Sequence, residues 1–304
     1  QCLHFCALKA IAIHATFSFS NVLCPLNRNN AQKGLKPMEH VGAQTQPARK
    51  KYFFFDIEGT LTTENPGGIV PKSTIRTLEA LRAKGHFVCI ATGRSQAKAL
   101  EYTKALGFDN VVSDGGNGIT IGGKIVEIVP LPLALCKQLI ADCEKKGFPW
   151  GVSTGNLPYR TCKDGTFWEA THDTFMKTLI APDFDYTKAT AIYKVYVACL
   201  EEQESQLPLL SQLPFARYHK EYIFVEPDDK SVGIRRMMDT LHAPYQDVVV
   251  FGDGKNDLKM FRPEWTSIAM GNGIEALKRK ATFVTKRSDE DGIEYACKHF
   301  GWID

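Results

Sequence analysis

The 304-residue sequence lacks three features that mark specialised classes of protein. It has no CxxC pair, and its nine scattered cysteines are odd in number, which argues against a disulfide framework and favours a reducing compartment. It has no long run of Lys and Arg, and a net charge of +3 is too small to indicate a nucleic-acid track. It has no uninterrupted apolar run long enough to span a membrane. We therefore expect a cytoplasmic protein that binds neither nucleic acid nor membrane.

The first 50 residues differ from the rest of the chain. Residues 5–24 are mildly apolar, but Lys9 and His14 interrupt them, so they fall short of a membrane span. The first methionine is Met38, which precedes an ordinary lead-in to the first predicted strand. We expect residues 1–50 to be a disordered leader or tag.

From residue 51 onward, short apolar runs alternate with amphipathic segments of helical period. The runs at 51–56, 86–93 and 110–116 predict strands, and the segments at 71–85 and 95–107 predict helices between them. Continuous apolar strands are typical of a parallel sheet that is covered on both faces. Two consecutive strand–helix–strand units predict a doubly wound, mostly parallel α/β sheet of the Rossmann-like kind.

The pattern changes in the middle of the chain. It predicts, in order, a hairpin at Gly122-Gly123, a helix at 133–147, half-exposed strands at 149–155 and 193–200, and a helix at 201–213. This mixture is typical of an α+β unit with an antiparallel sheet, and the parallel pattern returns from residue 229. We therefore predict a core domain of residues 51–128 and 224–304, into which a second domain, residues 129–223, is inserted.

Four polar clusters follow predicted strands or begin predicted helices. They are Asp56, Glu58 and Thr60; Thr92, Gly93 and Arg94; Lys230; and Asp253, Asn256 and Asp257. Because ligands bind at the carboxyl ends of the strands in an open parallel sheet, we expect these clusters to meet at one site. The carboxylates are hard oxygen donors suited to Mg²⁺, and the hydroxyl, backbone N–H and ammonium groups are donors for phosphate oxygens.

Such a set of groups can transfer a phosphoryl group. An aspartate that faces a clamped phosphate can act as a nucleophile, and a second carboxylate two residues later can move the protons. Taken singly, Asp56 is more typical of a helix cap and Lys230 of a surface charge. The conjunction of all four clusters, in order and at strand or helix ends, indicates phosphoryl chemistry.

The same segments resemble those of a haloacid dehalogenase (HAD) superfamily phosphatase of the Cof type, subfamily IIB. The matching segments are "FFFDIEGTLT", "IATGR", "DDKSVGIRRMM" and "FGDGKNDLKMF", and the resemblance covers about residues 51–304. It implies a HAD core with an inserted α+β cap domain that reads the substrate. It also implies a Mg²⁺-dependent phosphatase that hydrolyses small phosphorylated metabolites, sugar phosphates above all, through an aspartyl-phosphate intermediate.

The resemblance also implies roles for individual residues. Asp56 is then the nucleophile and Glu58 the acid/base residue, while Thr92, Gly93, Lys230 and Asn256 bind phosphate. Asp56, Asp253, Asp257 and the backbone carbonyl of Glu58 form the Mg²⁺ site, and Arg94, next to Thr92, is a weaker candidate for substrate contact. Only one helix fits between Asp56 and Thr92, so the cap is expected between Thr92 and Lys230, as in this subfamily.

Glu58 departs from the aspartate that is usual at the acid/base position. Its backbone carbonyl remains available to a metal, but the longer side chain displaces the carboxyl by roughly 1 Å, and a misplacement of that size can cost about 10²-fold in rate. Glu58 therefore leaves open a catalytically weakened protein that binds phosphate ligands. A phosphomutase of the phosphomannomutase type is a second alternative, because the resemblance extends to those enzymes, which share the superfamily and the cap position. In each case we expect a small phosphorylated metabolite as partner and a monomer or homodimer.

Overall fold

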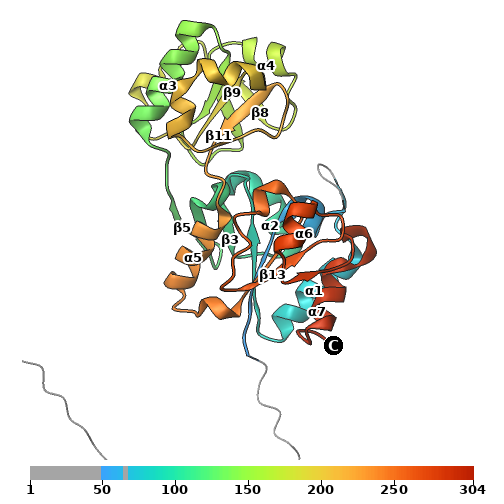
Figure 1. The fold of residues 1–304 in the computed structure, drawn as a ribbon. Helices are drawn as coiled ribbons and strands as arrows, with labels where there is room; N and C mark the ends of the chain where they lie inside the picture. Colours follow the sequence, from blue (N-terminus) through green and yellow to red (C-terminus); the bar gives the residue numbers. More distant parts are fainter. Residues whose placement is uncertain (1–48, 64–67) are drawn as a thin grey trace, which may run out of the picture. The chain divides into compact units, whose positions relative to one another are not determined.

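The computed structural model describes residues 49–63 and 68–304, so almost all of the predicted leader lies outside the described residues. The described residues all belong to one compact unit. The described strands form two sheets, of order β14-β13-β12-β1-β2-β3-β4-β5 and β10-β11-β9-β6-β7-β8 (Figure 1). In the described residues, no helix is both long and apolar enough to cross a bilayer.

The first sheet contains the predicted parallel core. Its strands are β1 Tyr52–Phe55, β2 Phe87–Ala91, β3 Val111–Ser113, β4 Gly118–Ile121, β5 Lys124–Ile128, β12 Val248–Gly252, β13 Thr266–Ala269 and β14 Phe283–Val284. In the order of the sheet, the neighbouring strands β14, β13, β12, β1, β2 and β3 are parallel. The hairpin of β4 and β5 adds an antiparallel edge. The strand order reverses between β1 and β12, which is the switch point where open α/β sheets bind ligands.

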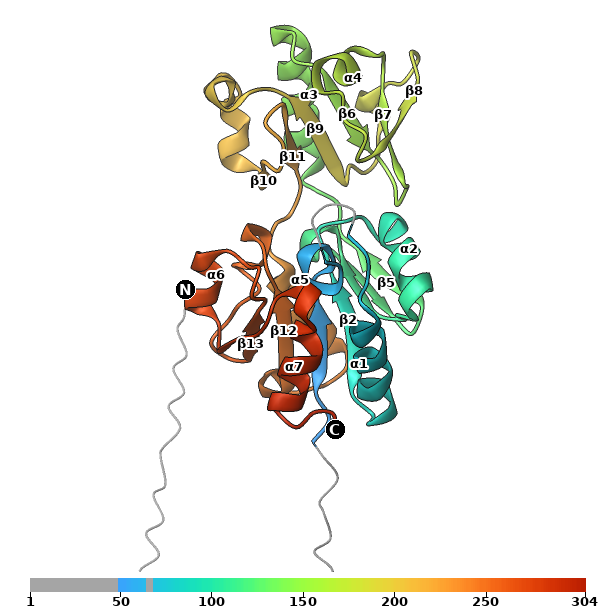
Figure 2. The same cartoon turned by 90° about the vertical axis from the view of Figure 1, so that its right-hand side faces the viewer.

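Helices cover both faces of this sheet, which explains the continuous apolar run of β1. The helices are α1 Lys72–Ala83, α2 Gln96–Leu106, α5 Lys230–Thr240, α6 Glu275–Lys280 and α7 Gly292–His299. Phe53 and Phe55 pack in one cluster with residues of α1, α2 and α7, whereas Phe54 packs in another with residues of α5 and α6. Helices α1 and α7 lie side by side (Figure 2). The predicted α/β layering is confirmed.

The second sheet is the predicted antiparallel one, with one parallel pair, β7 and β8. Its elements are α3 Leu133–Lys146, β6 Trp150–Ser153, β7 Tyr159–Cys162, α4 Thr166–Thr171, β8 Lys177–Ile180, β9 Lys194–Ala198, β10 Phe215–Ala216 and β11 Tyr222–Val225. Strands β6 and β9 are fully buried, so the prediction of half-exposed strands is wrong. The reason is that α3 packs on one face and Phe167 of α4 on the other.

One predicted helix does not form as a continuous helix. Residues 201–213 form two 3₁₀ turns, Glu201–Gln206 and Pro208–Gln212, because Pro208 has no N–H to continue a helix. After β12 the chain forms only a short turn, Lys255–Asp257. The limits of the predicted domains stay a prediction.

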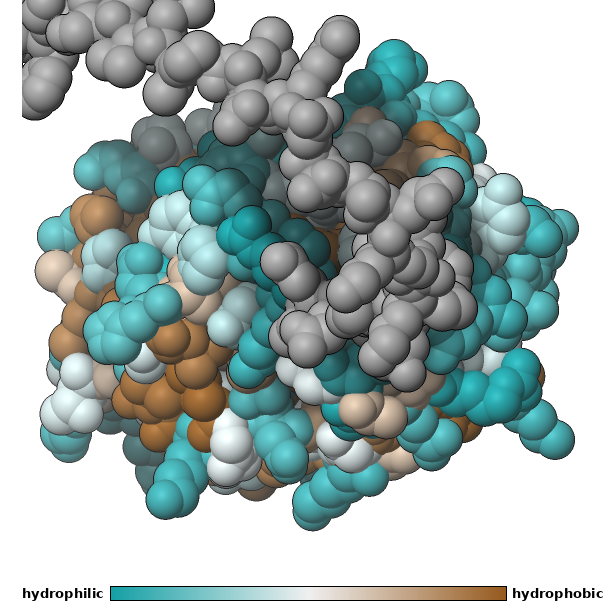
Figure 3. Space-filling view, turned by 90° about the horizontal axis from the view of Figure 1, so that it is seen from below, coloured by the Kyte–Doolittle hydropathy of each residue, from teal (hydrophilic) through white to brown (hydrophobic). Residues whose placement is uncertain are grey.

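Seen from below, hydrophilic side chains cover much of the visible surface, with small hydrophobic patches between them (Figure 3).

Candidate active site

Strand β1 delivers Asp56 to the carboxyl edge of the first sheet. The backbone N–H of Asp56 still donates to the Phe251 carbonyl of β12 (3.1 Å), and the chain then turns sharply over Ile57–Leu61. Gly59 has φ +72°, and a Cβ at this position would overlap the Asp253 carboxylate. The backbone conformation favours glycine here, and so does the close approach of the Asp253 carboxylate, which follows β12.

Three carboxylates meet at this edge. Ligand oxygens of Asp56, Asp253 and Asp257 all lie within 4.8 Å of one another. Asp257 accepts hydrogen bonds from the backbone N–H groups of Asp253 and Gly254, both at 3.0 Å, and the Thr60 hydroxyl donates to Asp253 (3.2 Å). The loop after β12 thus folds back on itself and fixes two of the three carboxylates.

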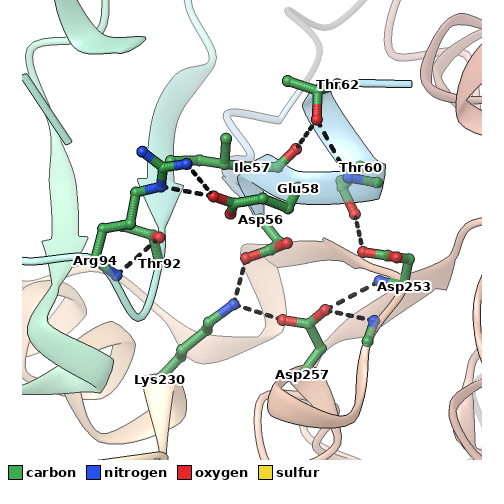
Figure 4. Close-up of polar contacts among 12 residues, drawn as sticks. Asp56, Ile57, Glu58, Thr60, Thr62, Thr92, Arg94, Lys230, Asp253 and Asp257 are labelled. Atoms are coloured by element: carbon green, nitrogen blue, oxygen red, sulfur yellow. Dashed lines mark hydrogen bonds and ion pairs between the residues drawn. The ribbon is translucent and has the colours of Figure 1, made fainter. Parts of the chain in front are cut away.

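Lys230 joins two of these carboxylates (Figure 4). It is the first residue of α5, and its buried Nζ lies 2.5 Å from Asp56 Oδ1 and 2.6 Å from Asp257 Oδ1. Asp229 caps the helix by accepting from the Ser231 N–H (3.0 Å), which fixes the start of α5 under the sheet edge. One lysine is therefore shared by two carboxylates, and its hydrogen bond to Asp56 is made to Oδ1 and not to Oδ2.

The cluster carries more negative than positive charge. Burial, with repulsion from Asp257 and others, raises the pKa of Asp56 well above its usual range even though Lys230 opposes the shift. Burial, followed by repulsion from Asp257, raises the pKa of Asp253 to about 7. Burial disfavours the charged form of Lys230, but Asp257 and Asp56 outweigh it and raise the lysine pKa.

This donor set fits a divalent cation. Its members are hard carboxylate oxygens, held close together, with a residual negative charge that a bound cation would offset. The sequence predicted Asp56, Asp253 and Asp257 as metal ligands, and the structure brings these three together.

Glu58 points away from this cluster, toward Arg94 (Figure 4). Its Oε1 lies 2.6 Å from Arg94 Nε and 2.5 Å from Arg94 Nη2, and both side chains are largely buried. Arg94 also bonds Glu101 (2.6 Å) and lies over the Tyr102 ring, 4.8 Å from its centroid. The predicted substrate residue Arg94 is thus the partner that orients the predicted acid/base residue.

The remaining predicted phosphate ligands line a cavity of about 370 Å³ beside the cluster. Thr92 follows β2, and its hydroxyl accepts the Arg94 N–H (3.1 Å), which leaves its own hydrogen free to donate. Thr92, Gly93 and Asn256 line the cavity together with Glu58, whereas Lys230 and the three carboxylates lie outside its lining.

The second sheet supplies the rest of the cavity wall. Lys194 of β9 donates to the Gly93 carbonyl (2.7 Å) and to Glu226, which ties this sheet to the phosphate-binding loop. Side chains that the sequence did not single out also line the cavity: Ser95, Lys98, Phe175, Met176, Tyr196, Tyr218, His219, Phe224 and Glu226. The aromatic run "YHKEYIF" at 218–224 was a signal for three of them, but its strand pattern indicated packing instead.

Comparison with known proteins supports this geometry. The family model of haloacid dehalogenase-like hydrolases matches residues 53–296. YkrA of Bacillus subtilis, named for an assumed phosphatase activity, is 29% identical over 262 residues, which cover 83% of this chain and 98% of that protein. YitU of the same bacterium, a 5-amino-6-(5-phospho-D-ribitylamino)uracil phosphatase, is 25% identical, with 81% of this chain and 95% of that protein covered.

A solved structure agrees in both sequence and fold. BT4131, described as a sugar phosphatase of HAD subclass IIB, is 30% identical with a TM-score of 0.68, and the match covers 84% of this chain and 100% of that one. The region that the family model matches, residues 53–296, contains every polar cluster that the sequence placed at strand or helix ends. The chain therefore belongs to the haloacid dehalogenase-like hydrolases and is a Cof-type phosphatase that hydrolyses phosphate esters.

Proposed function

We propose that the protein is a Mg²⁺-dependent phosphatase that acts on small phosphorylated metabolites through an aspartyl-phosphate on Asp56. The observation that carries this proposal is the position of Asp56 at the switch point, bonded to Lys230 and crowded by Asp253 and Asp257. Family resemblance and the sugar phosphatase among the similar structures favour sugar phosphates as the first class to test.

Asp56, Asp253, Asp257 and the backbone carbonyl of Glu58 would hold the metal. When bound, Mg²⁺ would offset negative charge on the phosphoryl oxygens. Thr92, Gly93, Asn256 and Lys230 would donate hydrogen bonds to the same oxygens, and the low-dielectric setting of the buried Lys230 strengthens its contribution.

The chain's own groups account for both half-reactions. Lys230 engages one oxygen of Asp56, so the other can attack phosphorus while the bond from phosphorus to the leaving oxygen breaks. Protonated Glu58 gives its proton to that oxygen, and the alcohol leaves. Ionised Glu58 then takes a proton from water, whose oxygen attacks phosphorus, releases phosphate and restores the Asp56 carboxylate.

A phosphate-release screen tests the proposal directly. Sugar phosphates, nucleotides, flavin mononucleotide and pyridoxal phosphate would be incubated with the protein, with and without Mg²⁺. We expect metal-dependent phosphate release that Asp56→Asn abolishes and that the exposed control Asp183→Asn leaves unchanged. Phosphate release by Asp56→Asn would show that the nucleophile is another group.

The same screen separates the alternatives. A hexose 1-phosphate converted to its 6-phosphate with little free phosphate would indicate a phosphomutase. Thermal stabilisation by phosphorylated metabolites without any turnover would indicate a weakened, ligand-binding protein. A small-molecule partner, a monomeric or homodimeric state, a cytoplasmic location and the absence of nucleic-acid and membrane partners stay predictions.

A further inference from the structure

The cavity beside Glu58 and Thr92 has an unusually aromatic side. We call the cavity-lining rings Phe175, Tyr196, Tyr218, His219 and Phe224 the aromatic wall. Its members contact one another: the Phe224 ring centroid lies 5.3 Å from those of Tyr196 and Tyr218 and 6.3 Å from that of Phe175. The wall is therefore one continuous surface, which a ligand would meet as a unit.

One ring of the wall is left uncovered. Tyr218 is 47% exposed, whereas Phe224 and Tyr196 beneath it are 4% and 0% exposed. The Tyr218 ring packs against Phe224, which holds it in place while about half of the residue stays exposed. An immobilised and exposed aromatic face inside a cavity is suited to cover a planar group of a ligand.

Cations complement this wall. Lys98 Nζ lies 3.3 Å from the Phe175 ring centroid, and Arg94 Cζ lies 5.5 Å from it. Arg94 is already paired with Glu58 and Lys194 with Glu226, but Lys98 forms no ion pair within residues 49–63 and 68–304. A planar π system in this cavity would thus gain from the rings and from nearby positive charge.

Part of the polar lining is already engaged by the protein. Glu58 and Glu226 accept from Arg94 and Lys194, and Ser95 accepts the Lys98 N–H as the cap of α2. A sugar hydroxyl would compete with these donors for Glu58 Oε1 and Glu226 Oε2, whereas a planar ring would contact the aromatic wall without displacing them. The volume of about 370 Å³ is near the lower end for small-molecule sites, which favours a single ring.

We propose that this cavity holds the leaving group of the substrate and selects phosphate monoesters whose leaving group is a single planar ring. Tyr218 is the residue that sets this preference. The inference rests on the proposed function, because it takes the phosphate to lie at Thr92 and Gly93, next to the cavity. It restricts the preferred substrates to phosphate esters of alcohols with a planar ring, a class that does not include the sugar phosphates.

Matched probes test the preference. Benzyl phosphate and cyclohexylmethyl phosphate have the same charge and similar size but differ in the planarity of the ring, and glucose 6-phosphate represents the sugars. We expect kcat/KM for benzyl phosphate to exceed that for cyclohexylmethyl phosphate by about three- to tenfold, the range of a single aromatic contact. Tyr218→Leu should reduce this ratio to about one, mainly through KM. The control Tyr295→Leu, at a residue 43% exposed on α7, should leave the ratio unchanged.

Binding separates this inference from the proposed function. The non-hydrolysable benzylphosphonate and cyclohexylmethylphosphonate would be titrated into the Mg²⁺-loaded protein by calorimetry. Tighter binding of benzylphosphonate that depends on Tyr218 supports the inference even if no ester is hydrolysed, in which case the proposed function fails alone. Equal binding of both phosphonates, or a higher kcat/KM for glucose 6-phosphate than for benzyl phosphate, overturns the inference.

Discussion

The two sheets each contain a buried group of charges, and the groups differ in how their charge is balanced. At the edge of the first sheet, Asp56, Asp253 and Asp257 share Lys230. In the second sheet, Arg160 faces a single carboxylate, that of Asp173, at 2.7 Å, with both side chains almost fully buried. The first group has carboxylates in excess, whereas the second is matched one to one.

The pKa values of the two groups move in opposite directions. Burial and repulsion from Asp257 raise the pKa of Asp253 to about 7. Burial alone would also raise the pKa of Asp173, but the Phe175 N–H and Arg160 outweigh it, so the pKa lies below its ordinary value. In the Arg160–Asp173 pair the two charges offset each other, and no further ion is needed. The three carboxylates that share Lys230 keep an excess of negative charge, which is typical of a site that binds a cation or carries out a reaction.

Removing the nucleophile Asp56 from the carboxylate cluster should have the largest effect, and the effect should be on turnover and not on stability. We expect Asp56→Asn to lower turnover by at least about 10⁴-fold, because the variant cannot form the acyl phosphate. Its thermal stability should stay equal to or above that of the wild type, because one of the repelling charges is lost. Phosphate release and thermal denaturation check both parts. An Asp56→Asn variant that is inactive because it is unfolded would contradict the view that this cluster serves activity and not stability.

Removing one partner of the balanced pair should affect stability instead. Asp173→Asn leaves Arg160 buried without a counter-charge, and breaking such a pair costs about 3–5 kcal/mol of unfolding free energy, which urea titration would measure. Asp183→Asn, on the exposed surface of the same domain, is the control and should change little. Because the pKa of Asp173 is depressed, its stabilising contribution is present above the ordinary value of 3.8 and is lost as the pH falls below it. The variant should lack this acid-sensitive component.

Shortening the acid/base residue should have an intermediate effect. Glu58→Asp moves the carboxyl roughly 1 Å from Arg94, and we expect kcat to fall by up to about 10²-fold with little change in stability. The matched control is Glu101→Asp, since Glu101 contacts Arg94 from its exposed side. Unchanged or higher activity of Glu58→Asp would show that the Arg94 contact does not position the acid.

Adding Mg²⁺ should have the smallest effect, a small gain in the free energy of unfolding. This gain should depend on the carboxylate cluster and not on the Arg160–Asp173 pair. At ten times its dissociation constant, Mg²⁺ should raise the free energy of unfolding by about 1.4 kcal/mol. Asp253→Asn should lose most of this gain, while Asp183→Asn should retain it. An equal Mg²⁺ response in Asp253→Asn would place the cation elsewhere, and the excess of carboxylates would then need another explanation.

The sequence predicted the parts of the site that depend on chain direction. Asp56, Thr92 and Asp253 each follow a parallel strand, so the parallel order alone brings them to one edge of the sheet. The contact between Glu58 and Arg94 could not be predicted in this way. It depends on the rotamers of the two side chains, which the strand order does not determine. No residue pattern favours Arg94 over the metal cluster as the partner of Glu58.

The cavity wall was predicted least well, for a physical reason. Phe175, Tyr196 and Phe224 come from one loop and two strands that are distant in sequence, and their lining role depends on how the second sheet folds. Trp150 and Arg160 are also aromatic or charged residues on strands of this sheet, but Trp150 packs in its core and Arg160 pairs with Asp173. Aromatic and charged residues on a strand have the same pattern whether they pack or bind.

The central claim is that Asp56 carries the phosphoryl group. Rapid acid quench of the Mg²⁺-loaded protein with a substrate found in the screen, followed by peptide mass analysis, measures this most directly. We predict a transient phosphoryl mass increment on the peptide that contains Asp56, absent from Asp56→Asn and unaffected by Asp183→Asn. Steady turnover with no label on that peptide, or label on another carboxylate, would contradict the account.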